Sequence, residues 1–323
     1  MFAISDDNLM TGDASIGFLP LAIYWTSYLY VPAAFALGWL TLKRRGAVRA
    51  GAALILAPLT VLAYARFVEP RMLLTREHDI ALSRCMAETG AARIAVFSDP
   101  HIGIFGNAIP VARIARRVNV LDADLLLIAG DFTNWLAPEA FGGAFAALGA
   151  IKVPVIAVLG NHDVGLPGPD VGAPLSEALG RLGVAVLDNA VTVIDIGGQP
   201  VEIAGLSDLW AEKQNRSLLE MRGNRPRLVL THNPATIRKL LPRQSVDLMI
   251  AGHTHGGQIR LPVVTCAMLP SMCRLTLGGL KETERGPVFV TTGTGMSGLP
   301  MRFNATPRID VLTVSWKACE ASG

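Results

Sequence analysis

The chain has 323 residues, of which 51% are hydrophobic and 17% are charged. This length allows one large globular domain with an additional segment, because single hydrophobic cores rarely grow beyond about 300 residues. The formal net charge is only +3, and the basic residues are scattered, so nucleic-acid binding is not expected. The four cysteines lack C-x-x-C spacing, which argues against a zinc ribbon or a thioredoxin-type motif. We expect at most one disulfide, between Cys266 and Cys273.

No charged residue occurs between Ala14 and Leu42. That run is long enough to cross a hydrocarbon core of about 30 Å, and it contains the Tyr and Trp side chains that are common near membrane interfaces. We predict a transmembrane helix over about residues 16–42. A buried core helix is the alternative, but core helices average only about 11 residues.

A second uncharged stretch, from Ala50 to Ala65, predicts another transmembrane helix over about residues 50–68. The loop between the two stretches contains four basic residues, whereas the N-terminal tail contains aspartates and no base. The positive-inside rule therefore places the loop in the cytoplasm, and a two-span hairpin would place the N-terminal tail and everything after Phe67 outside. Arg66, Arg71 and Arg76 weaken this asymmetry. A twin-arginine signal ending at Ala65 stays open as an alternative, and it also exports the remainder of the chain.

The pattern changes from about Arg93 onward to short aliphatic runs separated by helical or Gly/Pro-rich stretches, which is typical of an α/β domain. We predict a membrane anchor over residues 1–70, a juxtamembrane linker over 71–90 and one domain over 91–323, with two packed mixed sheets and helices outside them. Ten strands are expected, at Ile94–Phe97, Leu125–Ile128, Val155–Leu159, Val184–Leu187, Val191–Ile196, Val201–Leu206, Leu228–Leu230, Leu248–Ile250, Val288–Thr292 and Ile309–Val314. Helices are expected at Ile109–Val120, Glu139–Leu148, Ala173–Leu182 and Pro234–Leu241.

Five of these apolar runs end abruptly in Asp, Asn or His. Because ligands bind at the carboxyl ends of the strands in open α/β sheets, we expect the polar side chains to converge on one rim. Two carboxylates, one amide and four imidazoles are too many for one catalytic metal ion, but they suit two ions that share a carboxylate and act at phosphorus. The candidate ligands are Asp99, His101, Asp131, Asn161, His232, His253 and His255.

The motifs differ in specificity. Asp99-Pro-His101 and Gly130-Asp131 are common by chance, whereas Gly160-Asn-His-Asp163 and Gly252-His-Thr-His255 are difficult to explain by packing. With Thr231-His232, and in this order, they resemble the calcineurin-like metallophosphoesterase superfamily from about Arg93 to the end. The stretches Gly252–Gln258 and Gly293–Asn304 resemble its membrane-associated bacterial branch. The resemblance implies a four-layer αββα sandwich.

The resemblance also implies a division of the ligands. Asp99, His101 and His255 would hold one divalent ion, and Asn161, His232 and His253 would hold the other. Asp131 would bridge the two, and a metal-bridging hydroxide would attack phosphorus. Mixed nitrogen and oxygen ligands do not select among Mn, Fe, Zn, Co and Ni.

Four further side chains carry expectations of their own. The resemblance implies that His162 is not a ligand but faces the substrate and donates to the leaving oxygen or a phosphoryl oxygen. Asp163 is expected either to orient His162 or to cap the loop. Arg302 is expected to be either a bidentate phosphate contact or a surface arginine. His78 lies outside the motifs and is expected to be solvated.

The stretch Leu261–Arg274 is too apolar for an ordinary surface loop. A lid or lipid-facing patch and a buried crossover between strands both stay open. Outside the cell, a disulfide between Cys266 and Cys273 would brace the stretch. We therefore expect a membrane-anchored hydrolase of a phosphodiester, phosphomonoester or pyrophosphate bond, with a lipid-linked substrate and the bilayer as its partner. A non-catalytic membrane scaffold that binds a protein is the alternative, although such a scaffold would be expected to lose metal ligands.

Overall fold

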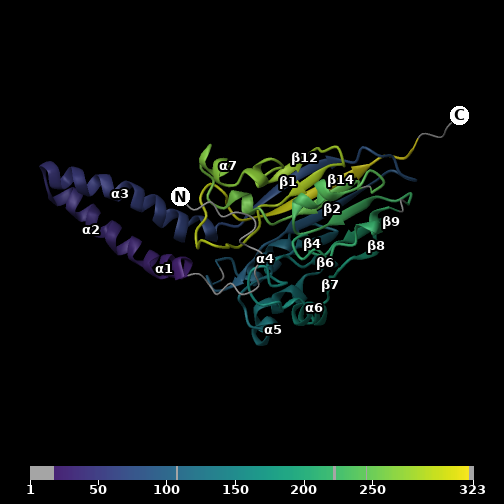
Figure 1. Cartoon of the computed structure of the whole chain (residues 1–323), viewed down its shortest axis with the longest axis horizontal. Coiled ribbons are helices and arrows are strands. Elements are labelled where there is room, and N and C mark those ends of the chain that lie inside the picture. Colours follow the sequence, from purple (N-terminus) through teal and green to yellow (C-terminus); the bar gives the residue numbers. More distant parts are fainter. Residues whose placement is uncertain (1–17, 107, 221–222, 245, 320–323) are drawn as a thin grey trace.

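The computed structural model describes residues 18–106, 108–220, 223–244 and 246–319, so the aspartates of the N-terminal tail lie outside the described residues. The first part is a helical hairpin that projects from one end of an α/β domain (Figure 1). Its outgoing arm contains α1 (Phe18–Thr26), a 3₁₀ turn (Ser27–Leu29) and α2 (Tyr30–Lys43), and α3 (Gly46–Phe67) returns to the domain. Both arms are long and apolar enough to cross a membrane.

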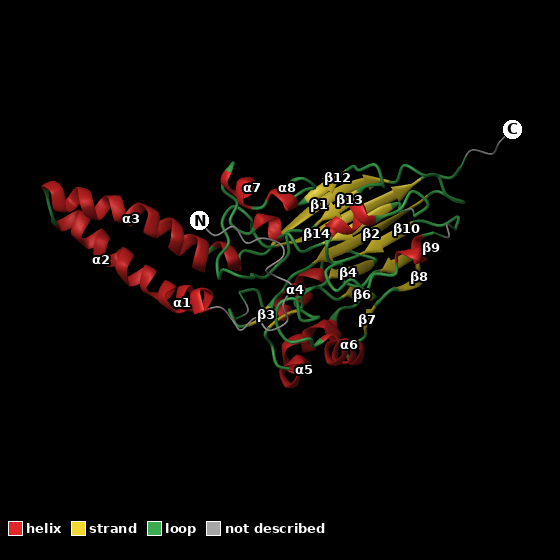
Figure 2. Ribbon diagram, in the orientation of Figure 1, coloured by secondary structure: helices red, strands yellow, loops and turns green. Residues whose placement is uncertain are grey.

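Two six-stranded mixed sheets form the domain (Figure 2). The first sheet has the order β1-β14-β2-β4-β6-β7, and the second has the order β12-β13-β11-β10-β9-β8. In each sheet the central strands run parallel, and antiparallel neighbours join them toward the edges. The strands of the first sheet are β1 (Leu74–Ala81), β14 (Arg308–Trp316), β2 (Gly90–Phe97), β4 (Leu125–Ala129), β6 (Val155–Val158) and β7 (Val184–Val186). Those of the second are β12 (Gly279–Lys281), β13 (Val288–Val290), β11 (Leu248–Ala251), β10 (Arg227–Leu230), β9 (Gln199–Gly205) and β8 (Ala190–Ile196).

The main core lies between the two sheets, where Ile94, Leu127, Ile203 and Leu230 belong to one buried cluster. A second cluster joins the outer face of the first sheet to the three helices that cover it, which are α4 (Val111–Val118), α5 (Phe141–Phe145) and α6 (Gly172–Arg181). On the outer face of the second sheet, Val229 and Met249 pack against Leu219 and Ile237. Leu219 lies in the 3₁₀ turn Arg216–Leu219, and Ile237 lies in the 3₁₀ turn Pro234–Lys239. The α-helix expected at Pro234–Leu241 is therefore wrong. The complete four-layer arrangement stays a prediction.

All ten predicted strands are present, with ends shifted by up to four residues. Four observed strands were not predicted: β1, β12 and a small parallel pair, β3 (Ile102–Gly103) with β5 (Thr133–Asn134). A linker was expected over residues 71–90, but β1 lies within this range and pairs with β14 along its whole length. This part of the linker prediction is wrong. His78 on this strand is half-buried, since its Nε2 lies 2.9 Å from Asp310 and its ring packs against Phe289. The expectation that His78 is solvated is therefore also wrong.

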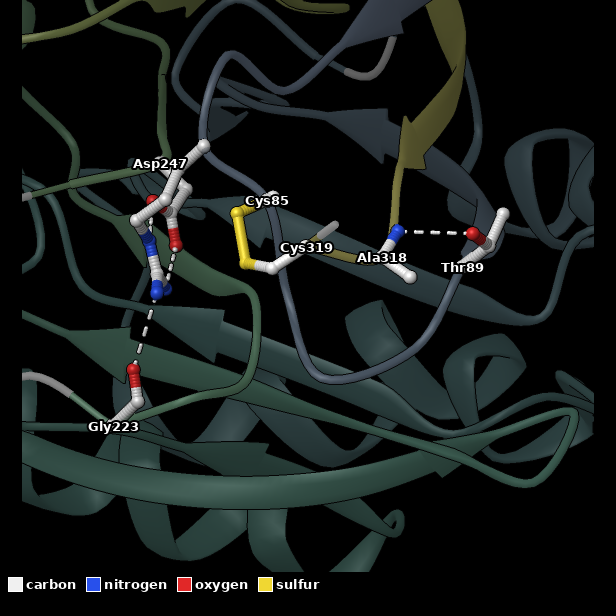
Figure 3. The surroundings of a disulfide bond; sticks show 7 residues. Cys85, Thr89, Gly223, Asp247, Ala318 and Cys319 are labelled. Carbon is white, nitrogen blue, oxygen red and sulfur yellow. Dashed lines mark hydrogen bonds and ion pairs between the residues drawn. A yellow bond between two sulfur atoms is a disulfide. The ribbon is translucent and has the colours of Figure 1, made fainter. Parts of the chain in front are cut away.

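The four cysteines form two disulfides rather than one. Cys266 pairs with Cys273, between α7 (Val264–Met268) and α8 (Pro270–Cys273). Cys85, which follows β1, pairs with Cys319, which follows β14. Next to this bond Arg84 forms an ion pair with Asp247, the residue before β11 (Figure 3). The Cys85–Cys319 bond therefore lies at the end of the sandwich opposite the carboxyl ends of the parallel strands.

Replacing both Cys85 and Cys319 by Ser is expected to lower the free energy of unfolding by about 2–4 kcal/mol, because the bond closes a long loop in the unfolded chain. The sequence separation of the pair is 234 residues. Chemical denaturation of the detergent-solubilised chain measures the effect. The Cys266→Ser/Cys273→Ser variant is the matched control, since its separation is only seven residues. An equal loss in both variants would contradict a chain-entropy origin.

Candidate metal centre

The seven candidate ligands lie at the carboxyl ends of central strands from both sheets. Asp99 and His101 follow β2, Asp131 follows β4 and Asn161 follows β6 in the first sheet. In the second sheet, His232 follows β10, and the pair His253 and His255 follows β11. The face-to-face packing of the sheets therefore brings seven side chains from five loops together on one rim.

One group of side chains surrounds Asp99 and is buried. The Nε2 atoms of His101 and His255 lie 3.0 Å apart. Oδ1 of Asp99 is 3.4 Å from Nε2 of His255 and 3.9 Å from Nε2 of His101. The other carboxylate oxygen, Oδ2, accepts hydrogen bonds from the Ser98 hydroxyl and from the backbone N–H of His253. Two imidazole nitrogens and one carboxylate oxygen are thus aimed at the same point.

A second group is centred on His232. Its Nε2 lies 3.1 Å from Oδ1 of Asn161 and 3.1 Å from Nδ1 of His253. The Asn161 oxygen is itself 3.0 Å from Nδ1 of His253. The amide nitrogen of Asn161 donates to the backbone oxygen of Leu166, which fixes the direction of its oxygen.

Asp131 lies between the two groups. Its Oδ2 is 3.4 Å from Nε2 of His101 and 3.2 Å from Nε2 of His232. Its Oδ1 accepts the backbone N–H of His162, which holds the carboxylate in this direction. Oδ2 of Asp131 therefore lies within 3.4 Å of a histidine nitrogen in each group.

In the second group, the hydrogen bond at Nδ1 of His232 leaves its Nε2 as the nitrogen that faces the other side chains. Nδ1 of His232 lies 2.7 Å from the backbone oxygen of Ala129, which can only accept, so this nitrogen carries the proton. Nε2 of His232 therefore faces the oxygens of Asn161 and Asp131. At this place Nε2 can either carry a second proton, which it donates to Asp131, or give its lone pair to a metal ion. A histidine that donates its other N–H to a backbone oxygen is the usual arrangement in metal sites.

The electrostatics of the second group favour a positive charge. Burial opposes the charging of His232, but the attraction of Asp131 and Asp99 prevails and raises its pKa well above the usual value. Burial and the neighbouring His232 lower the pKa of His253 to about 3. Asp131 and Asp99 therefore favour a positive charge at Nε2 of His232, which either a proton or a metal ion can supply.

The backbone at these loops is strained. Asp99, His101, Asp131, His253 and His255 all have positive φ angles, between 46° and 69°. Few non-glycine residues adopt this left-handed conformation, and such residues concentrate at functional sites, where the surrounding structure maintains them.

Gly160 is required beside Asp131, because a Cβ atom there would collide with Oδ1 and the backbone nitrogen of Asp131. Gly160→Ala is expected to displace this carboxylate and to lower the hydrolysis rate at least tenfold. Gly180→Ala in α6 is the matched control, since nothing lies within 4 Å of its Cβ position, and it should retain full activity and be up to about 1 kcal/mol more stable. Equal rates for the two variants would contradict the tight contact at Gly160.

Arg302 does not face the centre as a phosphate ligand, and it is not a surface residue either. Its side chain is fully buried. Its N–H groups donate to the backbone oxygens of four residues, at 2.7–3.3 Å: Thr292, Gly295, Ala305 and His255. Both expectations for Arg302 are therefore corrected, because its donors support the turns around His255 and Gly295.

His162 lies at the rim, with its ring edge against His101 at 4.7 Å between centroids. Its Nε2 lies 3.1 Å from the hydroxyl of Ser297. The carboxylate of Asp163 does not contact this ring. It accepts N–H bonds from Phe132, Thr133 and Gly160 instead, so it ties the Asp131 loop to the Asn161 loop. The expectation that Asp163 orients His162 is wrong, and the loop-cap alternative fits.

Three residues near the centre were not predicted as site residues: Ser297, Gln258 and Trp210. Gln258 binds the backbone of Ser297 and Leu299 and thereby positions the Ser297 loop. Trp210 packs its ring against His253 at 4.5 Å. It also lines an open cavity of about 400 Å³, with Val164, Leu166, Ala211, Glu212 and Lys213. No spacing motif marks these residues, although Gln258 and Ser297 fall within the two glycine-rich stretches that resembled the bacterial branch.

Comparison with known proteins places this centre in a family. Residues 92–257, which include all seven candidate ligands, match the calcineurin-like phosphoesterase family. The chain is 30% identical over 259 residues to the uncharacterized metallophosphoesterase YkuE of Bacillus subtilis, covering 78% of this chain and 88% of that protein. It is 31% identical over 277 residues to the phosphodiesterase YaeI of Escherichia coli, covering 84% and 98%.

A protein of Bos taurus named transmembrane protein with metallophosphoesterase domain is 28% identical over 296 residues, covering 86% of this chain and 65% of that protein. The family match extends over the strands and loops that carry the seven candidate ligands. The chain therefore belongs to the calcineurin-like phosphoesterases, a family of metal-dependent phosphoester hydrolases.

Proposed function

We propose that the chain is a membrane-anchored phosphodiesterase with two divalent metal ions. Asp99, His101 and His255 would hold one ion, and Asn161, His232 and His253 the other, with Asp131 shared. The observation that carries this proposal is that Nε2 of His232, whose Nδ1 is held by the backbone oxygen of Ala129, lies 3.1 Å from Oδ1 of Asn161 and 3.2 Å from Oδ2 of Asp131. Ions bound there would polarise the phosphoester and lower the pKa of water at the site.

The protein groups around the ions have separate tasks. His162 is placed to pass a proton toward a leaving oxygen, and Ser297 lies within hydrogen-bond distance of its Nε2. The cavity beside Trp210 is placed to take the leaving group, because Trp210 contacts His253 and Leu166 holds Asn161. A diester is the favoured substrate class, since the relative YaeI is named a phosphodiesterase. Phosphomonoesters and pyrophosphates are the other outcomes of a substrate test.

Two apolar helical arms suggest association with a membrane, and the name of the Bos taurus relative agrees with this. We propose residues 1–70 as the anchor in a bacterial inner membrane and an extracytoplasmic position for the domain. The hairpin supports this orientation, because its tip carries Arg44 and Arg45 at the end away from the domain. The two disulfides support it as well, since such bonds persist in oxidising compartments.

The orientation is tested by adding protease to intact spheroplasts. We expect the domain to be cleaved, whereas a cytoplasmic reporter protein in the same cells stays intact. A domain that is cleaved only after lysis would contradict the extracytoplasmic position.

A lipid-linked substrate is proposed on the basis of the anchor and the apolar segment after Gln258. The test compares lipid extracts of cells with and without the gene. A phosphoester lipid that accumulates in the deletion, and that the purified full-length chain hydrolyses with Mn²⁺, would support the proposal. Accumulation of a water-soluble phosphoester alone would contradict it.

A further inference from the structure

A short apolar surface follows the metal centre in the chain. No charged residue occurs between Arg260 and Arg274. Within this interval Leu261, Val263, Val264 and Met268 are exposed, with exposed fractions of 86% for Val263 and 70% for Met268. We call Leu261–Met268 the apolar loop. The buried-crossover expectation for this stretch is therefore wrong, because these side chains point to the outside.

The apolar loop is held in one shape. The buried Thr265 hydroxyl donates to the backbone oxygen of Ile259 and accepts the N–H of Leu261. The Cys266–Cys273 disulfide joins α7 to α8. Val263 at its tip has a φ angle of 65°, which is unfavourable for a β-branched residue. Strain and cross-links thus maintain the exposure of apolar side chains, which is costly in water and characteristic of an interaction surface.

The root of the loop lies beside the end of α3. The backbone N–H of Arg302 donates to Ala65, in the last turn of α3, at 2.9 Å. The backbone oxygen of the next residue, Phe303, accepts the N–H of Arg260 at 2.7 Å. Glu69, just after α3, accepts the N–H groups of Asn304 and Ala305. One stretch of chain therefore bridges the end of the helical hairpin to the start of the apolar loop.

This arrangement determines what the loop can reach. If α3 ends at the membrane surface, the apolar loop lies at the same level, at the end of the domain from which α1–α3 project (Figure 1). Exposed Arg260 and Arg274 flank it on both sides in the chain. An apolar tip between two basic residues fits the boundary between acyl chains and anionic headgroups.

We propose that the apolar loop inserts into the bilayer surface next to the anchor, with Arg260 and Arg274 at lipid phosphates. The inference rests on the proposed membrane anchor. It places the metal turn, His253–Gln258, directly above lipid headgroups, because the loop begins only a few residues after that turn.

Photo-crosslinking of the full-length chain tests the proposal, in nanodiscs of phosphatidylcholine and phosphatidylglycerol. Three variants carry p-benzoylphenylalanine in place of Val263, of Val193 on β8 or of Leu54 in α3. All three native side chains are exposed. We expect lipid adducts at positions 263 and 54, and at least tenfold less at 193. Replacing Arg260 and Arg274 by Gln should lower the share of phosphatidylglycerol in the adduct at 263.

The outcomes distinguish insertion of the apolar loop from anchoring by the helical hairpin. Lipid adducts at 54 but not at 263 would overturn the docking of the loop and leave the anchor intact. No adduct at either position would overturn both. An adduct at 263 with a second copy of the chain would replace lipid by protein as the occupant. An unchanged phosphatidylglycerol share would overturn the role of the arginines.

Discussion

Asp131→Asn is expected to lower phosphodiester hydrolysis about 10³-fold, because the loss of metal-ion stabilisation costs several kcal/mol and each tenfold costs about 1.4 kcal/mol. The substitution keeps the shape of the side chain, and Oδ1 can still accept the N–H of His162. It replaces the oxygen between His101 and His232 by a neutral group that cannot bridge two cations. Steady-state rates on bis-p-nitrophenyl phosphate with Mn²⁺ measure the loss.

Metal content separates this loss from misfolding. Asp131→Asn should contain fewer than two metal ions per chain and keep its circular dichroism spectrum. Asp195→Asn, at the exposed end of β8, is the matched control and should keep both its rate and its metal. Full activity of Asp131→Asn would contradict a shared carboxylate.

Arg302→Met is expected to destabilise the chain by more than about 4 kcal/mol, because four buried backbone oxygens lose charged donors. Arg302→Lys should recover little of this, since an ammonium group cannot reproduce the planar set of donors. Thermal unfolding of the full-length protein in detergent measures the loss. Arg181→Met, whose side chain is 64% exposed in α6, serves as the matched control with little change.

The same variants test whether Arg302 binds phosphate or supports the surrounding backbone. If this side chain bound phosphate, Arg302→Lys would unfold at the normal temperature and show a raised KM. We expect the opposite, with an unchanged KM in the fraction that remains folded. The link from Ala65 through Arg302 to His255 also predicts that the helical hairpin helps to support the metal centre.

The sequence was most informative where apolar runs met polar residues. A run such as Leu125–Ala129 is buried on both faces, so every residue in it is apolar and the strand can be recognised from a single sequence. The polar residue after each run then predicts the rim, because parallel strands end together. The strand-end rule predicts that Asp131 and His232 lie close together, and in the structure they do, although they are 101 residues apart in the chain.

The missed features depend on contacts that no local pattern records. β1 contains Arg76, Glu77 and Asp79, so an edge strand with charged side chains looked like a linker. The charge of Arg302 suggested an anion, but its partners are backbone oxygens that the fold brings around it. Cys85 and Cys319 lie at opposite ends of the domain sequence, and only the pairing of β1 with β14 makes them neighbours.

We propose that two metal ions bind between the histidine groups and share Asp131. Crystals of the full-length protein grown with Mn²⁺ test it most directly by anomalous scattering. We predict two peaks, one bounded by Asp99, His101 and His255 and the other by Asn161, His232 and His253. A single peak, or none, in crystals of a fully active preparation would contradict it.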